Sequence, residues 1–104
     1  MTLRGLLVDA AGQLDDVESA LTPEGAMTWS RVGRPFSVLA PDGTSAEFGL
    51  DPAVAAAAAR TPDVELSSRG AGWVTFTPVE MDDHAADRAV AWLASAHRRL
   101  GPRD

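Results

Sequence analysis

Three acids and a histidine in the last quarter of the chain have the residue types and spacing of a metal site. Asp83 and Asp87 are one helical turn apart, and His84 shares a helix side with Asp87, so two carboxylates and an imidazole would converge on a helix. Asp82 precedes them directly. Capping and the helix dipole also favour acids at the start of a helix, and this structural role is the preferred interpretation. A metal-dependent enzyme is therefore kept only as the second alternative.

A second group of residues has the chemistry to bind a flat ligand. Arg31 and Arg34 flank a predicted hairpin turn, and Arg69 lies in a later loop. Trp29 and Trp73 fall on predicted strands, and their alternation with neighbouring residues indicates that one of them faces outward. An outward indole beside Leu39 and Arg31 would hold a planar anionic or aromatic molecule by stacking and cation–π attraction. For each tryptophan taken singly, packing in the core is the preferred interpretation, and the ligand platform is the hypothesis set against it.

Other catalytic chemistries lack the residues that they need. The chain has no Cys, which excludes disulfides, thiolate zinc sites, iron–sulfur clusters and cysteine nucleophiles. His97 lies on the apolar stripe of a predicted helix, where we expect a hydrogen-bonded, partly buried imidazole. Gly70-Ala71-Gly72 precedes a strand instead of opening a helix, so it is interpreted as a turn and not as a phosphate loop. The sequence therefore predicts no enzyme and no cofactor.

The charge balance disfavours nucleic acid as a partner. The 104 residues contain nine Arg, no Lys and fifteen acids, for a net charge of -6. Neither half of the chain is basic, whereas affinity for duplex DNA depends on cations that neutralise phosphates. A local patch of Arg31, Arg34 and Arg69 is the one arrangement that would still favour DNA. The absence of Lys, Asn, Ile and Tyr indicates a GC-rich, bacterial genome.

Length and hydropathy predict one folded domain over residues 1–104. Hydrophobic residues make up 45% of the chain, which is enough for a single core. No apolar run approaches the roughly 18–20 residues that cross a bilayer, and the first residues reach acids too soon for a signal peptide. We therefore expect a cytoplasmic protein without a membrane partner.

The spacing of apolar residues in the first half predicts a helix followed by strands. The first apolar residues recur at helical spacing: Leu3, Leu7, Ala10, Leu14, Val17 and Leu21. Gly5 and Gly12 lower the helix propensity, so this helix is expected to be short or to end near Asp15. From residue 26 to 50 the period changes to two and predicts three strands, joined by turns at 32–34 and 41–43 as antiparallel hairpins.

The second half alternates between helices and strands. Asp51-Pro52 predicts the start of an alanine-rich helix that ends before Thr61-Pro62. Residues 64–66 predict a short edge strand, and residues 73–77 predict a further strand. A last helix is expected from Asp82 or Asp83 to Leu100, with stop signals after it at Gly101 and Pro102. The order predicts the α+β class: an antiparallel sheet of four to five strands with helices on one face.

Several short motifs follow one another along the chain: the run from Met27 to Leu39, Pro41-Asp42-Gly43, Leu50-Asp51-Pro52, Gly72-Trp73-Val74 and a closing helix. Their order and spacing resemble the MmcQ/YjbR family over roughly residues 14 to 102. The resemblance implies an α+β fold similar to that of CyaY and frataxin, and the family's usual label implies DNA binding. The family has no established catalytic set, so the resemblance implies no active-site residue.

The resulting hypothesis is a non-catalytic binding module that recognises a small planar molecule or a protein partner through the open sheet face. The residues expected to bind the ligand are Trp29, Arg31, Arg34, Arg69 and Trp73. DNA binding is the alternative, and the sequence does not specify an oligomeric state.

Overall fold

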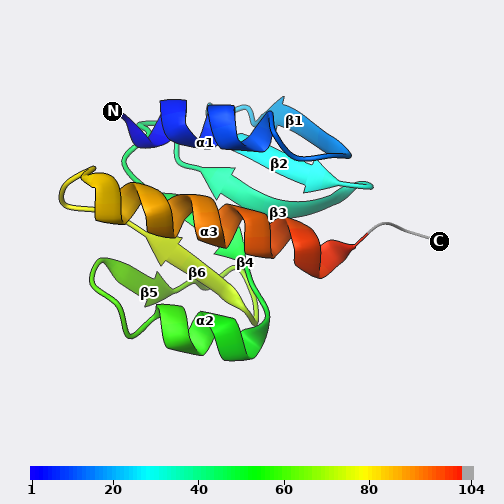
Figure 1. The fold of residues 1–104 in the computed structure, drawn as a ribbon. Coiled ribbons are helices and arrows are strands. Elements are labelled where there is room, and N and C mark those ends of the chain that lie inside the picture. Colours follow the sequence, from blue (N-terminus) through cyan, green and yellow to red (C-terminus); the bar gives the residue numbers. More distant parts are fainter. Residues whose placement is uncertain (102–104) are drawn as a thin grey trace.

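A computed structural model describes residues 1–101 as a six-stranded sheet with three helices (Figure 1). The elements in chain order are α1 (Leu3–Ala11), β1 (Val17–Leu21), β2 (Met27–Arg31), β3 (Arg34–Leu39), β4 (Ala46–Gly49), α2 (Pro52–Ala58), β5 (Val64–Leu66), β6 (Trp73–Phe76) and α3 (Asp83–Leu100). Pro102, expected to stop the last helix, lies outside the described residues. The predicted domain therefore contains every element expected from the sequence and one additional strand.

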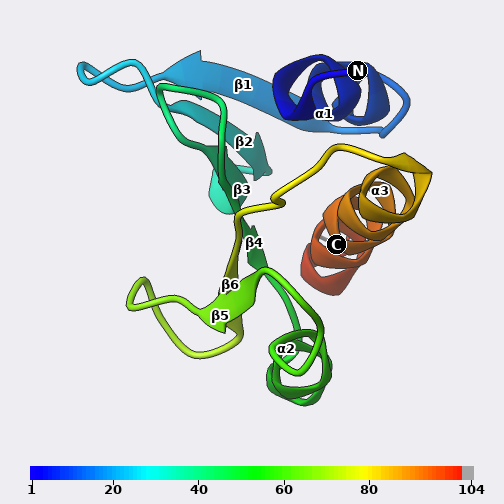
Figure 2. The same ribbon diagram turned by 90° about the vertical axis from the view of Figure 1, so that its left-hand side faces the viewer.

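The sheet is antiparallel throughout, in the spatial order β1-β2-β3-β4-β6-β5. All three helices lie on the same side of it, as the edge-on view shows (Figure 2). This arrangement confirms the predicted α+β class. It also leaves the opposite side, here called the open face, without a helix in the described part of the chain.

The additional strand, β1, corrects the expectation that residues 17–21 continue the helical stripe. The helix ends at Ala11, and Asp16 then takes a left-handed conformation with φ 59° before the chain pairs with β2. Val17 and Leu21 are four residues apart, a spacing that places them on one side of a helix and equally on one face of a strand. The five-residue ladder with β2 decides between the two periods.

The predicted helix starts are confirmed by their capping contacts. Asp51 Oδ1 accepts a hydrogen bond from Ala53 N at 3.0 Å, and Asp82 Oδ1 accepts one from Ala85 N at 2.8 Å. Each side chain satisfies a backbone donor that has no partner within the helix. The alanines of the short α2 then pack closely, since Ala55 and Ala58 are buried.

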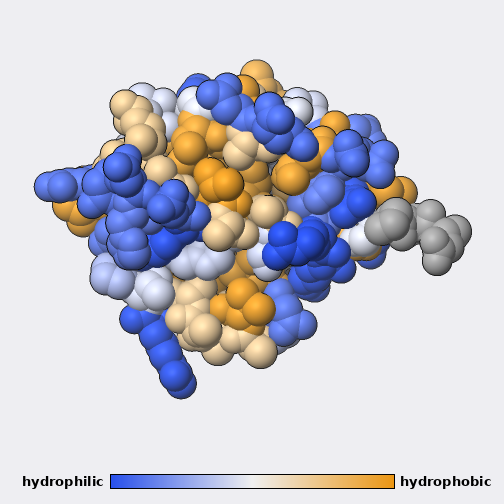
Figure 3. Space-filling model, viewed as in Figure 1, coloured by the Kyte–Doolittle hydropathy of each residue, from blue (hydrophilic) through white to orange (hydrophobic). Residues whose placement is uncertain are grey.

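The core lies between the sheet and the helices. Its largest fully buried apolar side chains come from both layers: Leu7, Phe36, Leu39, Phe48, Leu50, Val74, Phe76 and Leu93. Some apolar surface remains on the helix side, between α1 and α3 and over α2 (Figure 3). No helix within residues 1–101 is both long and apolar enough to cross a membrane.

Candidate functional site

The two tryptophans of the predicted ligand site lie on opposite faces of the sheet. Trp29 is only 2% exposed and belongs to the core on the helix side. On β6, Val74 and Phe76 are fully buried in that same core, so the alternating Trp73 and Thr75 point to the open face. Trp73 is partly exposed and is the outward-facing member of the pair.

The two arginines of the β2–β3 hairpin, Arg31 and Arg34, are held on the helix side by the end of α3. Arg31 is 8% exposed, and its Nη1 donates to the carbonyl oxygen of His97 at 2.9 Å. Arg34 Nη2 donates to the carbonyl oxygen of Leu100 at 2.9 Å. These carbonyls belong to the last helical turn, where backbone acceptors lack intrahelical partners. Arg31 and Arg34 therefore cap α3 and do not join Arg69 in a basic patch.

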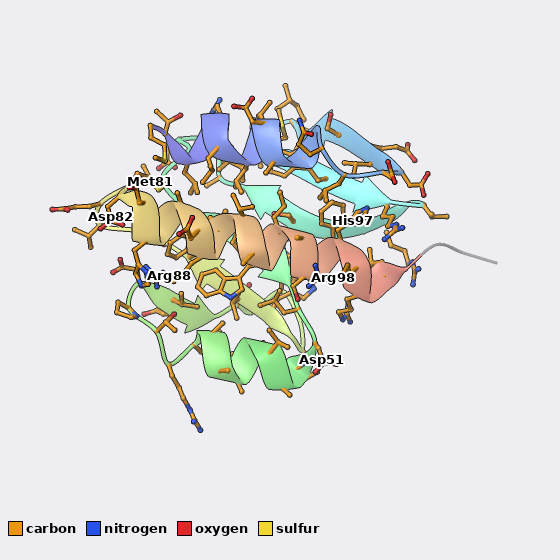
Figure 4. The ribbon with its side chains drawn as sticks, viewed as in Figure 1. Asp51, Met81, Asp82, Arg88, His97 and Arg98 are labelled. Carbon is orange, nitrogen blue, oxygen red and sulfur yellow. The ribbon has the colours of Figure 1, made fainter. Side chains whose placement is uncertain are left out.

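His97 completes this buried network. Its Nδ1 lies 3.4 Å from Arg31 Nη1, and its Nε2 lies 2.6 Å from the carbonyl oxygen of Asp15. Since the guanidinium only donates, Nδ1 is the acceptor and Nε2 carries the proton that it donates to Asp15. The His97 side chain points away from Arg88, as the stick view shows (Figure 4). Arg88 extends from the other side of α3 and donates to the carbonyl oxygen of Pro62, just before β5. The expected buried, hydrogen-bonded imidazole is thus confirmed.

On the open face, four side chains make up what we call the Glu47 cluster: Glu47, Ser67, Arg69 and Trp73. Arg69 Nη2 donates to Glu47 Oε1 at 2.9 Å, and the Ser67 hydroxyl donates to Glu47 Oε2. Ser67 Oγ also accepts from the backbone N of Arg69 at 3.1 Å, which ties the loop to the strand. The Arg69 guanidinium carbon lies 5.4 Å from the centre of the Trp73 ring.

The Trp73 indole lies against its own sheet. Gly49 is its direct partner on β4, and a Cβ atom at that position would come within 2.9 Å of the ring. Glycine at position 49 thus lets the indole lie against the β4 backbone, and Arg69 lies over the ring. The expectation of an outward indole beside Leu39 and Arg31 needs correction: the outward indole is Trp73, whereas those two residues lie on the helix side. Trp73 instead supports Arg69.

Glu47 is ionised at neutral pH despite its partial burial. Burial raises the pKa of its carboxyl, but hydrogen bonds from Arg69 and Ser67 and the nearby charge of Arg69 outweigh that effect and hold the pKa below its ordinary value. Each carboxylate oxygen accepts one protein hydrogen bond and has capacity for another. The cluster therefore presents acceptors on Glu47 beside the remaining donors of Arg69, whose side chain is 44% exposed.

A hollow of about 530 Å³ lies beside this cluster on the open face. Its lining comes from the residue before β2, from β3, β4, β5 and β6, and from the β3–β4 turn and the β5–β6 loop: Ala26, Val38, Ala40, Pro41, Ser45, Glu47, Leu66, Ser67, Ser68, Arg69 and Thr75. The turn and the loop project from the open side of the sheet (Figure 2). Apolar and polar groups thus line one hollow, which is how ligand sites combine contact area with orientation.

The acids and the histidine considered as an alternative metal site lie at the start of α3. Asp82 is engaged as the cap of α3, and Asp83 lies in the first helical turn. Across residues 1–101, no three His, Asp or Glu side chains are grouped so that they would hold a metal ion. The acids at this helix start thus have the capping and dipole role that was the preferred interpretation.

Sequence reasoning missed Glu47, Ser67 and Ser68 as candidate site residues. The available signal was an acid in the middle of a predicted strand, where alternation with buried Ala46 and Phe48 places it on the outer face. Its contact with Ser67 spans 20 positions and depends on the pairing of β4 with β6, which the spacing of residues does not specify.

Comparison with known proteins identifies the fold. No protein-family model matches the sequence, and no curated protein matches it. A crystal structure of a protein from Pseudomonas syringae, determined as a structural-genomics target, is similar, with a TM-score of 0.64 and 10% sequence identity. The match covers 89% of this chain and 94% of that one. At this identity the likeness concerns the fold alone.

Proposed function

We propose that this protein is a non-catalytic binding module that recognises a small planar molecule through the hollow on its open face. The observation that carries the proposal is the position of the Arg69–Glu47 pair at a hollow of about 530 Å³. Arg69 supplies donors and Glu47 supplies acceptors at neighbouring positions. A ligand edge with one acceptor and one donor would bind both.

The remaining lining supports a flat ligand of modest size. Val38 and Thr75 belong to the strands under the hollow, and Pro41 and Ser68 belong to the segments beside it. Apolar contact with the floor would provide affinity, while the charged pair would fix the orientation. Trp73 acts as a positioning residue in this site, because it lies beneath Arg69 and is absent from the lining.

DNA binding finds less support in the same geometry. Strand alternation places Glu18, Glu47 and Glu65 on the open face, where Arg69 is already paired with a carboxylate. The hairpin arginines lie on the other face and bond to α3. A phosphate binder would require free cations on one surface. A titration with duplex DNA at low salt should therefore show no saturable binding.

Three monosubstituted benzenes provide a direct test, because they share one ring and differ in charge: benzamide, benzamidine and benzoate. We expect benzamide to shift backbone amide resonances of residues 66–69 and Thr75, since it offers both a donor and an acceptor. Arg69→Ala should weaken this binding at least about fivefold through loss of a charge-assisted hydrogen bond. Arg60→Ala, an exposed position outside the hollow, is the matched control. Absence of shifts at the hollow with all three probes would contradict the proposal.

Membership of the MmcQ/YjbR family is part of the same proposal. The order of helices and strands supports it, as do the motifs at residues 27–39 and 50–52. A cytoplasmic location is proposed with it. The absence of cysteine fits a chain that does not depend on disulfides.

A further inference from the structure

The two edges of the sheet differ in how well they are protected from pairing with another strand. β5 has three residues and follows Thr61-Pro62, so it offers few backbone groups to a new neighbour. β1 has five residues, contains no proline and only one charged residue, Glu18, and has a strand neighbour within residues 1–101 only on its β2 side. Longer edges with few such protecting residues are the ones that accept additional strands.

The sequence of β1 is self-complementary in an antiparallel register centred on Ser19. In that register Val17 of one copy opposes Leu21 of the other, and Glu18 opposes Ala20. No acid directly faces another acid, although each chain is strongly acidic. The charges on β1 therefore permit β1 of a second copy to be the pairing partner.

An apolar groove accompanies this edge on the helix side. It has a volume of about 340 Å³ and is lined by Val8, Ala11, Gly12, Leu14, Val17, Ser19, Met27 and Trp29. Leu21 points to the same side, because it pairs with Met27 across the β1–β2 ladder, and it is 67% exposed. The symmetric register brings the Leu21 of each copy opposite the Val17 that lines the groove of the other.

We propose that the protein forms a two-fold symmetric homodimer by pairing of β1 with β1, with Leu21 of each copy seated at the partner's groove. Main-chain hydrogen bonds extend the sheet across the interface, and the two leucines bury apolar surface. In this register no two acids lie directly opposite each other. The net charge of -6 on each chain still opposes association. The dimer is thus expected to strengthen with added salt.

Cysteine cross-linking tests the register, because the natural chain contains no Cys. Ser19→Cys places the new thiol opposite its own copy, whereas Glu18→Cys places it diagonally. Under mild oxidation, S19C should form a disulfide-linked dimer at least about tenfold faster than E18C, because opposed Cβ atoms are ~4.5–5.5 Å apart and diagonal ones about 7–8 Å. Equal rates for the two variants would overturn the register.

Analytical ultracentrifugation over a series of protein concentrations tests the dimer itself. Leu21→Ser should weaken association at least about tenfold, because each interface loses two buried leucines. Leu66→Ser is the matched control, since Leu66 is also 67% exposed and lies on the other edge. Circular dichroism spectra should be unchanged in both variants. A wild-type chain that stays monomeric at all concentrations and salt levels, or equal loss of association in both variants, would overturn the proposal.

Discussion

Arg31 and Arg69 lie on opposite faces of one sheet and differ in burial and in their closest partners. Arg31 is 8% exposed and donates to a helix-end carbonyl at 2.9 Å, next to an imidazole nitrogen, while its ion pair with Asp16 is longer, at 3.9 Å. The Arg69 side chain is 44% exposed, and it pairs with the carboxylate of Glu47 at the hollow on the open face. Both were expected to bind a ligand. The comparison shows that the side chain's partners and exposure, more than its type, decide whether an arginine is structural or available to a ligand.

The same contrast holds for the two tryptophans. Trp29 is enclosed by the core, whereas Trp73 lies between the β4 backbone and a guanidinium at the surface. Burial of an aromatic side chain contributes in proportion to the area removed from water. The helix side should therefore govern stability, whereas ligand recognition by the open face belongs to the proposed function.

Truncating the two tryptophans gives the largest expected effect. Trp29→Ala should lower the free energy of unfolding by about 3–5 kcal/mol, because it leaves a cavity in the core. Trp73→Ala should lower it by only about 1–2 kcal/mol, since the ring is partly exposed. Urea unfolding followed by circular dichroism measures both. Equal losses of unfolding free energy in the two variants would mean that the helix side does not contribute more to stability than the open face.

Removing the guanidinium of Arg31 should have the next largest effect. Arg31→Met keeps an apolar stem but removes the donors to His97, and it should cost about 2–3 kcal/mol because a buried carbonyl loses its partner. Arg34→Met is the comparison, since the exposed Arg34 makes a similar bond to Leu100. Its loss should cost less than about 1 kcal/mol, because water replaces the donor. A smaller effect of Arg31→Met than of Arg34→Met in chemical denaturation would reverse this ranking.

The smallest effect concerns the pH dependence of Glu47. Its folded pKa is lowered from 4.5, so its contribution to stability is present above that pH and is lost as the pH falls through the folded value. Glu47→Gln should therefore be less stable than wild type near pH 7, by under about 1 kcal/mol, with the difference vanishing in acid. Urea midpoints at several pH values give this difference. A gap that widens in acid would mean that the carboxylate does not stabilise the fold.

Local signals were enough to predict most of the elements, and long-range contacts explain what they missed. Asp51-Pro52 and Asp82 predicted helix starts because a cap depends on neighbouring residues. Residues 17–21 were misassigned because a spacing of four residues fits a helix and a strand alike. The roles of Arg31 and Arg69 depend on His97 and Glu47, which are 66 and 22 positions away. Such partners are set by strand pairing and by the packing of α3 on the sheet, which single-sequence patterns do not encode.

The bonds from the β2–β3 hairpin to the last turn of α3 bear on the order in which the chain folds during synthesis. Arg31 and Arg34 reach carbonyls 66 positions further on, and α3 packs against α1, β3 and β4. During synthesis the first strands emerge well before this helix, so the apolar side of β3 and β4 lacks the cover that α3 provides until residues 83–100 leave the ribosome. The nascent chain is therefore expected to stay open to chaperones until its last quarter is released, and to close around α3 in one late step.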